Sequence, residues 1–495
     1  MFLLNKVSYN NYYKYTIVII ILIFYLFLTN CSSSILRTSI MTITVIINKL
    51  FNIKIKKIDI MLITLIIAIM INPFIIYEVG FQFSYIISLT LNIMSKKINA
   101  KKNVFVKNLY TSYICFIISL PICIYHFYQV NLLGIILNLI MIPLISIIIF
   151  PLTIITFICP IIYNFYTITI DILETINNLA SNINIFTINF MKPSLIVIMI
   201  YYLTISITLI NFKFIIFLIV FTLIHKFYPY FCNETIFTFL EVGQGDCILI
   251  SYPNNKTNIL IDTGGSINYT KEKWKKRKNT YSISKNKIIP YLKSKDVTKL
   301  DYLIITHGDY DHMGEAINLV NNFKVEKVIF NCGPYNDLEQ ELIKVLDKKK
   351  ITYYSCIKEL NIDNNKLYFL QTKEYDNEND NSNVIYTELN SYKFMFMGDV
   401  SITTEKEIIN KYNLANIDVL KVGHHGSRTS SSKEFIDEIN PKYSIISVGK
   451  NNRYGHPNKE VLENLKTSKI YRTDEDGSIM FKIKNNNLKI ETCRP

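Results

Sequence analysis

Cysteine and histidine are both scarce in this chain, and acidic residues are almost missing from its first 232 positions. The nine cysteines include no Cys-x-x-Cys pair, which argues against a closed structural zinc site built from thiolates. We interpret them as small buried apolar residues, with an extracellular disulfide in the second half as the alternative. Histidine occurs only seven times, so a cluster of histidines carries information.

Charge and hydropathy divide the chain near residue 232. Residues 1–232 contain 15 Lys and Arg against 4 Asp and Glu, a balance of +11, and they are overwhelmingly apolar. Residues 233–495 carry the remaining 38 basic and 35 acidic side chains, a balance of +3. The sequence therefore predicts a polytopic α-helical membrane domain over 1–232, in contact with lipid, and a second domain over 233–495.

Several apolar runs of the first half approach the length of about 20 residues that a helix needs to cross a bilayer. Others are shorter, so half-crossing segments are expected among them. The first run is interpreted as a span and not as a cleaved signal, because further apolar runs follow it. The candidate spans are 15–29, 60–72, 74–93, 109–129, 131–150, 151–168, 194–212 and 214–231.

Basic loops between these runs predict an orientation. Three lysines between 54 and 57 precede one pair of spans, and five lysines between 96 and 107 follow it. Both clusters are expected in the cytoplasm, because positively charged loops stay inside. If 131–168 crosses twice, the run 214–231 carries the second half to the outer side of the membrane. If 131–168 dips in and returns, the sides reverse.

Polar residues interrupt the apolar runs more often than a simple anchor requires. A glutamine and a serine fall within the run 80–84, and Asn72-Pro73 and several later prolines break others. Such groups persist at membrane depth only where protein or a water-filled cavity satisfies them. The pattern favours a conduit, with hydrogen bonding between helices as the alternative. The residues expected along the conduit are Arg37, Gln82, Ser84, Asn131 and Asn138.

The second half alternates expected strands and helices, which is typical of a layered α/β domain. The expected helices are 311–321, 405–411 and 433–439. The expected strands are 236–240, 247–251, 258–261, 324–330, 351–356, 366–370, 392–397, 419–422 and 443–448.

The segment 306–315, THGDYDHMGE, follows directly after the apolar run 303–305. A strand followed by a loop would place its ligand-type side chains at one edge. Carboxylate oxygens and imidazole nitrogens suit Zn or Mn, and this spacing favours a pair of ions over one closed site. Two such ions generate hydroxide near neutral pH and clamp both reacting oxygens of a displacement, so the segment predicts a hydrolase. The four candidate ligands are His307, Asp309, Asp311 and His312.

Further candidates stand where other expected strands end. Together with the segment 306–315, these motifs contain five of the seven histidines. A carboxylate at Asp399 would be placed to bridge two ions. For Asp262 the alternatives are direct metal binding and holding a turn. The remaining candidates are Asp246, Lys421, His424, His425, Ser427 and His456.

Taken in order, LEVGQGDCILI, ILIDTGG, THGDYDHMGE, FMGDV, LKVGHHGS and YGHP resemble the metallo-β-lactamase fold, an αββα sandwich. More narrowly they resemble the hydrolase domain of the ComEC competence proteins. SSSILRTSIM, NPFIIYEVGFQFSYI and NLLGIILNLIMIPL resemble the membrane segments of the same family. The resemblance covers roughly residues 30–490. It implies a channel in the bacterial inner membrane that passes single-stranded DNA into the cell during natural transformation, and a hydrolase that degrades the strand left outside.

Two departures from the family pattern affect these expectations. Typical members carry an N-terminal domain related to OB-folds, which we do not find here, so a DNA-gripping element is expected to be missing or supplied by another chain. The wider fold uses His-x-His-x-Asp-His, whereas Asp309 stands at the second histidine. No histidine occurs between 313 and 398, and the Asn-Asp-Asn-Ser segment 379–382 occupies the place of the usual intermediate ligand. We expect a weaker or more Mn-like site.

The resemblance implies phosphodiester hydrolysis with one or two divalent ions, Mn or Zn. Asp399 and one of His424 or His425 join the four ligands above, and Asp311 also orients the attacking hydroxide. Lys421, Ser427 and His456 are expected to meet the phosphate or protonate the leaving oxygen; an ion pair with a site carboxylate is the alternative for Lys421.

DNA is the expected partner of both halves, together with a DNA receptor and a cytoplasmic DNA translocase. A contact with single-stranded DNA is expected at the lysine-rich stretch 271–279, which contains Trp274, with a solvated loop as the alternative. Two other functions remain open: a transporter with an inactive hydrolase-like domain, and a membrane-tethered hydrolase of another substrate.

Overall fold

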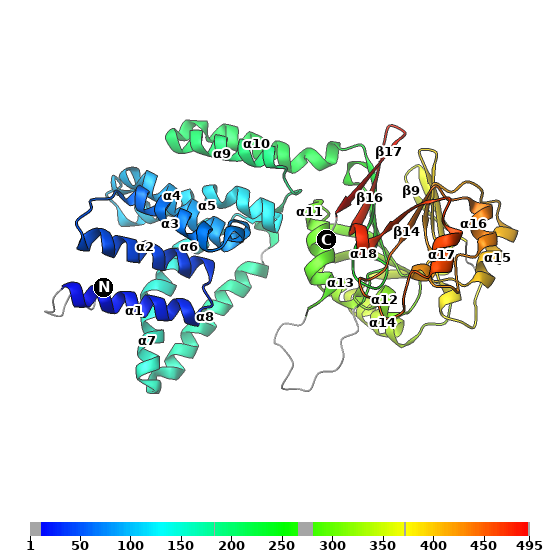
Figure 1. Ribbon diagram of the computed structural model, residues 1–495, viewed down its shortest axis with the longest axis horizontal. Helices are drawn as coiled ribbons and strands as arrows, with labels where there is room; N and C mark the ends of the chain where they lie inside the picture. The colour runs from blue at the N-terminus through cyan, green and yellow to red at the C-terminus, as the bar shows by residue number, and fades with distance from the viewer. Residues whose placement is uncertain (1–10, 183, 266–280, 371–372, 494–495) are drawn as a thin grey trace. The chain divides into compact units, whose positions relative to one another are not determined.

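The structure, a computed structural model, describes residues 1–495 except 1–10, 183, 266–280, 371–372 and 494–495. Two compact units divide between His225 and Lys226, a few residues before the boundary expected at 232. The first unit is helical and the second is built on two β-sheets (Figure 1). The lysine-rich stretch 271–279 lies outside the described residues.

The helical unit contains helices where apolar runs were expected, and two that were not assigned as spans, α2 and α8. A short antiparallel ribbon of β1 (Gln129–Asn131) and β2 (Thr187–Asn189) joins distant parts of this unit. The helices are α1 (Asn11–Leu28), α2 (Ser33–Leu50), α3 (Lys57–Ile71), α4 (Val79–Asn99), α5 (Val104–Phe127), α6 (Gly134–Pro143), α7 (Phe150–Ile158), α8 (Tyr163–Asn182), α9 (Leu195–Ile210) and α10 (Ile215–Phe227).

The predicted division of 131–168 into two spans is wrong. Residues Gly134–Ile158 form one continuous apolar helix of 25 residues. Pro143 lies inside it and is followed by a stretch of π-helix, Leu144–Ile149, between α6 and α7. Proline has no backbone N–H to donate, and the π-helical stretch accommodates the missing hydrogen bond by a local change of hydrogen-bonding pattern. The helix therefore continues where the prolines of the sequence suggested a break.

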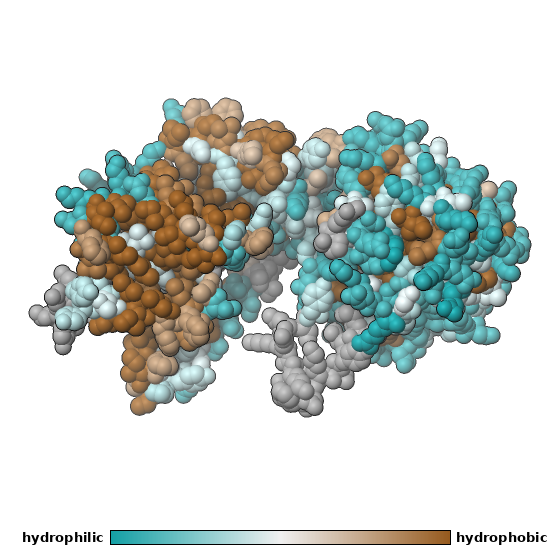
Figure 2. Space-filling view, in the orientation of Figure 1, coloured by the Kyte–Doolittle hydropathy of each residue, from teal (hydrophilic) through white to brown (hydrophobic). Residues whose placement is uncertain are grey.

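Three helices among the described residues are long and apolar enough to cross a membrane, fewer than the eight spans expected. They are Val104–Phe127, Gly134–Ile158 and Phe212–Phe231; Tyr12–Leu28 and Leu195–Ile210 are apolar but shorter. Apolar side chains cover most of the visible surface of this unit, whereas hydrophilic ones dominate that of the other (Figure 2). Exposed apolar helices of this kind are suited to lipid.

The polar residues expected along a conduit lie in different surroundings. The guanidinium of Arg37 donates to Ser88 Oγ at 3.0 Å and lies 5.8 Å from the ring centroid of Tyr85. Gln82 lines one cavity of 410 Å³. Asn131 and Asn138 line another, of 370 Å³. Ser84 lines neither of these two cavities.

The second unit is an αββα sandwich of two mixed sheets. One sheet has the order β17-β16-β3-β4-β5-β6-β7-β8 and the other the order β15-β14-β13-β12-β11-β10-β9. Both contain parallel strands, β5 to β8 and β12 to β15. The strands are β3 (Thr235–Phe239), β4 (Ile248–Ser251), β5 (Asn258–Ile261), β6 (Lys299–Ile304), β7 (Lys324–Phe330), β8 (Thr352–Ser355), β9 (Glu359–Ile362), β10 (Asn365–Phe369), β11 (Ile385–Leu389), β12 (Tyr392–Phe396), β13 (Val419–Lys421), β14 (Tyr443–Ile446), β15 (Lys469–Arg472), β16 (Ser478–Lys484) and β17 (Asn487–Cys493).

Three apolar layers hold this sandwich together. Phenylalanines from both sheets fill the middle layer, where the rings of Phe237 and Phe394 stack at 3.9 Å between centroids. Helices α11 (Ile289–Ser294), α13 (Ala316–Asn322) and α14 (Asp337–Lys349) cover the outer face of the first sheet. Helices α15 (Ile402–Lys411), α16 (Lys433–Ile439) and α17 (Lys459–Asn464) cover the other. All three layers are built from residues of this unit alone.

Two of the nine cysteines are bonded to each other. Cys332 follows β7 and Cys356 follows β8, and the two form a disulfide across a separation of 24 residues. Their interpretation as buried apolar residues is therefore wrong, and the disulfide alternative applies to this pair. Cys247, by contrast, is a buried free cysteine.

Candidate metal centre

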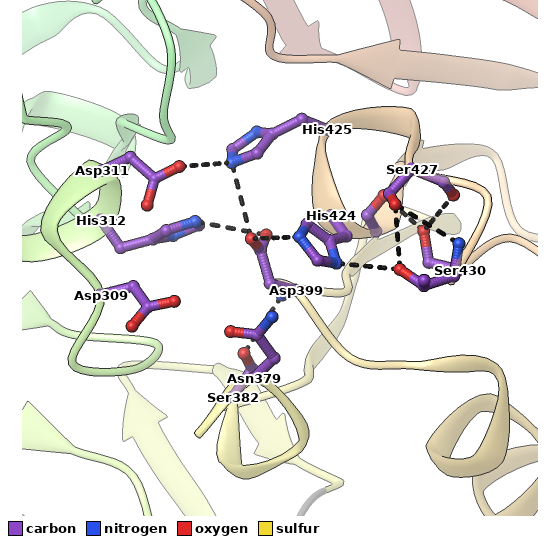
Figure 3. A network of polar contacts seen from close by, with 12 residues as sticks. Asp309, Asp311, His312, Asn379, Ser382, Asp399, His424, His425, Ser427 and Ser430 are labelled. Carbon is purple, nitrogen blue, oxygen red and sulfur yellow. Dashed lines mark hydrogen bonds and ion pairs between the residues drawn. The ribbon is translucent and has the colours of Figure 1, made fainter. Parts of the chain in front are cut away.

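The candidate ligands gather where strands of both sheets end. Asp262 follows β5, and the segment 306–312 follows β6. From the other sheet, Asp399 follows β12 and the segment 423–427 follows β13. Carboxyl ends of parallel strands open onto the same edge, which is how ligands separated by more than 100 residues meet. Figure 3 shows Asp311 and His312 facing His424 and His425, with Asp399 between them.

Asp399 is the centre of this arrangement. Its Oδ1 lies 3.2 Å from His312 Nε2, and its Oδ2 lies 3.6 Å from His425 Nε2. The second histidine of the pair, His424, approaches the same Oδ2 with its Nε2 at 3.8 Å. Asp311 Oδ2 is 3.2 Å from His425 Nε2. The two oxygens of the Asp399 carboxylate thus lie near three imidazoles, one oxygen beside His312 and the other beside His424 and His425. This is the position expected of a carboxylate that could bridge two ions.

His307 and Asp309 form a second side of the cluster. His307 is fully buried, and its Nε2 lies 3.6 Å from Asp309 Oδ2, whereas Asp309 is about half exposed. His307 Nδ1 lies 3.2 Å from Ser382 Oγ, which also accepts the backbone N–H of Asp399 at 3.1 Å. Ser382 therefore connects the two sides of the cluster.

Unusual backbone conformations aim these side chains. His424 and His425 both have positive φ, 46° and 53°, a left-handed conformation that non-glycine residues adopt rarely. A Cβ on Gly245 would lie 2.0 Å from the carbonyl oxygen of Asp311, so only glycine permits that close approach. Local strain is thus concentrated at the residues that present the imidazoles.

Asp262 supports the site from behind and does not face its centre. Its Oδ2 lies 2.8 Å from His312 Nδ1, and its carboxylate also accepts the backbone N–H and the hydroxyl of Thr306, at 2.8 and 2.6 Å. A carboxylate on Nδ1 fixes the imidazole as the tautomer with a free Nε2 lone pair. Of the two roles considered for Asp262, the geometry matches the holding role, and that role extends to the imidazole.

Lys421 and Asp246 form a buried ion pair beside His425. The ammonium of Lys421 lies 2.5 Å from Asp246 Oδ2 and donates to the Val422 carbonyl at 2.9 Å, and its side chain is fully buried. Asp246 Oδ1 lies 3.6 Å from His425 Nδ1, which is 2.9 Å from the Ser447 carbonyl oxygen. The geometry matches the ion pair considered as the alternative for Lys421, because a fully buried ammonium cannot reach a substrate phosphate without breaking it.

Four buried atoms of the cluster make no hydrogen bond to the described residues. They are His307 Nε2, His312 Nε2, His425 Nε2 and Asp399 Oδ1. One ligand atom each from Asp311, His312, Asp399 and His425 fall within 4.8 Å of one another. Buried polar atoms are rarely left unpaired, and here they converge with nitrogen–oxygen distances of 3.2 to 3.6 Å. Imidazole nitrogens and carboxylate oxygens gathered in this way fit a divalent cation.

The electrostatics favour positive charge at the same place. Burial raises the pKa of Asp399, but His312 and His425 outweigh it and hold the pKa well below its usual range. Burial lowers the pKa of His312, yet Asp399 and Asp262 raise it well above the ordinary value. The carboxylates therefore stay ionised and attract either protons on the imidazoles or a metal cation.

His456 and Ser427 lie at the margin of the cluster. The His456 ring lies 6.0 Å from that of His424, and burial, with the charges of His425 and His424, lowers its pKa. Ser427 Oγ lies 2.9 Å from Thr429 Oγ1, so its hydroxyl is engaged in closing its own loop.

Several supporting residues were not predicted from the sequence. Glu378 accepts the backbone N–H of Gly308 at 2.7 Å, and Asn336 donates to the Gly308 carbonyl at 2.8 Å. Thr306 and Ser382 hold Asp262 and His307 as described above. In the sequence, the segment 379–382 is notable only for lacking a histidine. Its serine, Ser382, lies three residues before the strand β11, and only the fold shows that its hydroxyl reaches the site.

Comparisons with known proteins agree with this architecture. Residues 1–214 match the Competence protein family, and residues 240–450 match the metallo-beta-lactamase superfamily. ComE operon protein 3 of Bacillus subtilis (strain 168) is 28% identical over 494 residues, covering 93% of this chain and 62% of that protein. Competence protein ComA of Neisseria gonorrhoeae is 28% identical over 270 residues, covering 53% of this chain and 34% of that protein. The chain is homologous to ComEC.

This ComEC homologue thus joins a competence-protein domain to a hydrolase-superfamily domain with candidate metal ligands. The alignments cover less than two thirds of the length of both relatives. Among solved structures, the metallo-beta-lactamase fold protein YhfI from Bacillus subtilis aligns with a TM-score of 0.34 at 11% identity, covering 50% of this chain and all of that one. The αββα assignment rests on the family match and on the sheet topology above.

Proposed function

We propose that this protein is a membrane channel for DNA uptake whose second unit hydrolyses phosphodiester bonds of the strand that is not transported. The observation that carries the hydrolase half is the convergence of three imidazoles on the two oxygens of Asp399, with unpaired ligand atoms facing one another. The match of residues 1–214 to the Competence protein family supports the nucleic-acid context. The proposed partners are DNA, membrane lipid, a DNA receptor and a cytoplasmic translocase.

The residues divide the proposed chemistry between them. One or two divalent ions, Mn or Zn, would be held by His307, Asp309, Asp311, His312, Asp399, His424 and His425, and would supply polarisation of a phosphoryl oxygen and a lowered pKa for water. Asp311, partly exposed beside His425, is placed to orient the attacking water. Asp262 and the Lys421–Asp246 pair fix the two imidazoles that carry the lone pairs. His456 is placed to donate a hydrogen bond to the leaving oxygen.

The helical unit supplies features of a conduit. Gln82 connects two helices there, because its Oε1 lies 2.8 Å from His126 Nε2 while its Nε2 donates to the Ile76 carbonyl. Tyrosines share the wall of the same cavity, among them Tyr85, Tyr125 and Tyr202. Polar and aromatic groups facing a cavity inside an apolar unit support a wet path, since such groups are costly against lipid.

A contact between helix ends supports the proposed orientation without counting the span 131–168. Lys97, in the last turn of α4, donates to the carbonyls of Leu209 and Ile210 at the end of α9, both at 2.8 Å. The start of the next apolar helix, Phe212–Phe231, therefore belongs to the same side as the lysine cluster. One crossing then carries the second unit to the opposite, outer side.

The disulfide supports the same placement. Disulfides form and persist in oxidising compartments and are rare in the bacterial cytoplasm. Cys332–Cys356 lies in the second unit, near the loop that carries Asn336. An outer location also suits degradation of a strand that does not enter the cell.

The hydrolase half is tested on the fragment 233–495, which contains both sheets and all three apolar layers. We expect it to fold alone and to cleave single-stranded DNA only with a divalent cation. The double variant Asp309→Ala, Asp311→Ala should lose both bound metal, measured by elemental analysis, and activity. Undiminished cleavage by that variant would exclude the assignment.

The orientation is tested by cysteine labelling in whole cells. The exposed cysteines Cys31, Cys159 and Cys493 are first replaced by serine. A membrane-impermeant maleimide should then label Asp363→Cys on the second unit and leave Asn99→Cys unlabelled until the membrane is opened. The reverse pattern would place the hydrolase in the cytoplasm.

One observation favours a second candidate, a membrane-tethered hydrolase. Only three described helices are long and apolar enough to cross a bilayer, and Arg37 is bonded to Ser88 and lies near Tyr85 without lining either cavity named above. Normal transformation by a well-expressed Arg37 and Gln82 double variant would favour this candidate.

A further inference from the structure

A cavity beside the metal centre is not used by the chemistry described so far. Its volume is 410 Å³, within the range of roughly 300–1,000 Å³ that small-molecule sites occupy. Asp309 and Asp311 form part of its wall, so it opens directly onto the candidate ligands. The rest of the wall comes from two loops, 242–244 and 451–454, and from Gly265 and Tyr310.

Two tyrosine rings are the dominant apolar surfaces of this cavity. Tyr310 is 37% exposed and Tyr454 is 62% exposed, which is unusual for large rings placed next to a buried polar cluster. Tyr310 is held in place by glycines: a Cβ on Gly265 would lie 2.9 Å from its ring, and a Cβ on Gly314 equally close. The Tyr454 ring stacks on His456, with centroids 5.7 Å apart and an interplanar angle of 28°. Each ring is thus fixed on one side while still exposed to the cavity.

Two amides of the cavity wall help to build the loops around it. Gln244 Oε1 accepts the backbone N–H of Gly449. Asn452 donates to the carbonyls of Gly449 and His456 and accepts the His456 N–H. The Asn452 amide is therefore engaged in shaping its own loop. The exposed Arg453, on the same loop, brings a guanidinium to a wall that otherwise contains two carboxylates.

We propose that this cavity is a nucleobase-stacking subsite, in which Tyr310 and Tyr454 receive the base next to the scissile phosphate of a single strand. Every base offers an aromatic face, so stacking tolerates all four bases. The proposal rests on the proposed function, since it names the substrate feature that the same site recognises.

The test uses the full chain in detergent with two probes. One is a fluorescent thymidine oligonucleotide of about eight nucleotides, within the usual site size of single-strand modules. The other is the same strand with abasic residues, which keeps the phosphates and removes the bases. Binding is measured by anisotropy in the presence of a chelator, and cleavage is measured separately with Mn²⁺.

The wild type is expected to bind the base-bearing strand about tenfold more tightly than the abasic one. Tyr454→Ala and Tyr310→Ala should each reduce that preference severalfold and leave abasic binding unchanged, whereas Tyr454→Phe and Tyr310→Phe should retain it. Tyr354→Ala, at an exposed ring on β8 outside the cavity wall, is the matched control and should behave as wild type.

Equal binding of the two strands by the wild type would overturn the subsite, as would equal losses on both strands in the tyrosine variants. Failure of the proposed function has a different signature. If base-dependent binding persists but no strand is cleaved with Mn²⁺ or Zn²⁺, the subsite stands and the phosphodiesterase assignment falls.

Discussion

Polar side chains that contact one another are arranged differently in the two units of this chain. In the helical unit, contacts join side chains from different helices two at a time: Arg37 with Ser88, Gln82 with His126, and Tyr201 with His225. In the α/β unit they converge, because Asp399 alone approaches three imidazoles. Pairs between helices stabilise packing and line cavities, whereas convergence at strand ends creates a place for a cation. Polar residues therefore serve helix packing in the first unit and a cation site in the second.

The largest effect is expected from removing the charge at the centre of the cluster. Asp399→Asn should lower metal content to near zero and reduce metal-dependent cleavage by about 10³-fold or more. The reason is that the substitution removes the negative charge of the one carboxylate that approaches all three imidazoles. Elemental analysis and single-turnover cleavage measure the two effects. Asp363→Asn, at an exposed turn between β9 and β10, is the control. Retention of full metal content by Asp399→Asn would remove Asp399 from the centre of the site.

A smaller loss is expected when the residue behind His312 is changed. Asp262→Asn keeps the size of the side chain but weakens its hold on His312 Nδ1, and outer carboxylates of this kind are worth about 10–100-fold in metal affinity or activity. Competitive titration with a chelating dye measures the affinity. An effect as large as that of Asp399→Asn would instead make Asp262 a direct ligand.

The helical unit should respond independently of the metal centre. Gln82→Leu removes the contacts with His126 and Ile76, and Arg37→Leu removes the contact with Ser88. Each should reduce DNA uptake by about tenfold, since a buried polar partner left unpaired costs roughly 1–3 kcal/mol. Cleavage by the hydrolase unit should be unchanged. Ser146→Ala is the control, because that hydroxyl bonds only to its own helix, at the Ile142 carbonyl.

Transformation frequency measures uptake, and membrane fractions must contain each variant at the normal level. Parallel loss of uptake and cleavage at normal expression would contradict the division of tasks between the units.

The smallest effect concerns stability and pH. Glu339 accepts the Asn336 N–H at the start of α14, its other oxygen is buried without a hydrogen bond to the described residues, and burial raises its pKa to about 7. A carboxyl whose folded-state pKa is raised contributes stability that is fully present below its unfolded pKa, about 4.3, and is lost as pH rises through about 7. We expect the free energy of unfolding of the fragment 233–495 to fall by about 1–3 kcal/mol as the pH rises from about 4.3 to about 7.

Glu339→Gln retains a capping oxygen but cannot ionise, so its free energy of unfolding should depend less on pH. Urea denaturation followed by circular dichroism, at several pH values, measures the slope. The exposed Glu341→Gln on the same helix should keep the wild-type slope. Identical slopes for all three proteins would show that Glu339 does not titrate between pH 4.3 and 7.

Much of the α/β unit was determined by local pattern. The ranges expected for β5, β7 and α16 agree with the structure residue for residue, because short apolar runs bounded by turn residues leave few alternatives. The edge strands β9 and β17 were not predicted, since their half-exposed residues carry a weak signal, and neither was β16, the neighbour of β17. In the membrane half, prolines suggested a break inside 134–158, but a π-turn let the helix continue.

The sequence by itself determined which residue types the site contains, because histidine is scarce and its clusters stand at strand ends. It did not determine their roles. Only tertiary structure placed Asp262 behind His312 and paired Lys421 with Asp246, since both depend on which strands become neighbours across the sheets. Tertiary structure also brought Ser382 to His307 and joined Cys332 to Cys356. Local pattern fixes what a strand end carries, whereas strand order and sheet packing fix what that end faces.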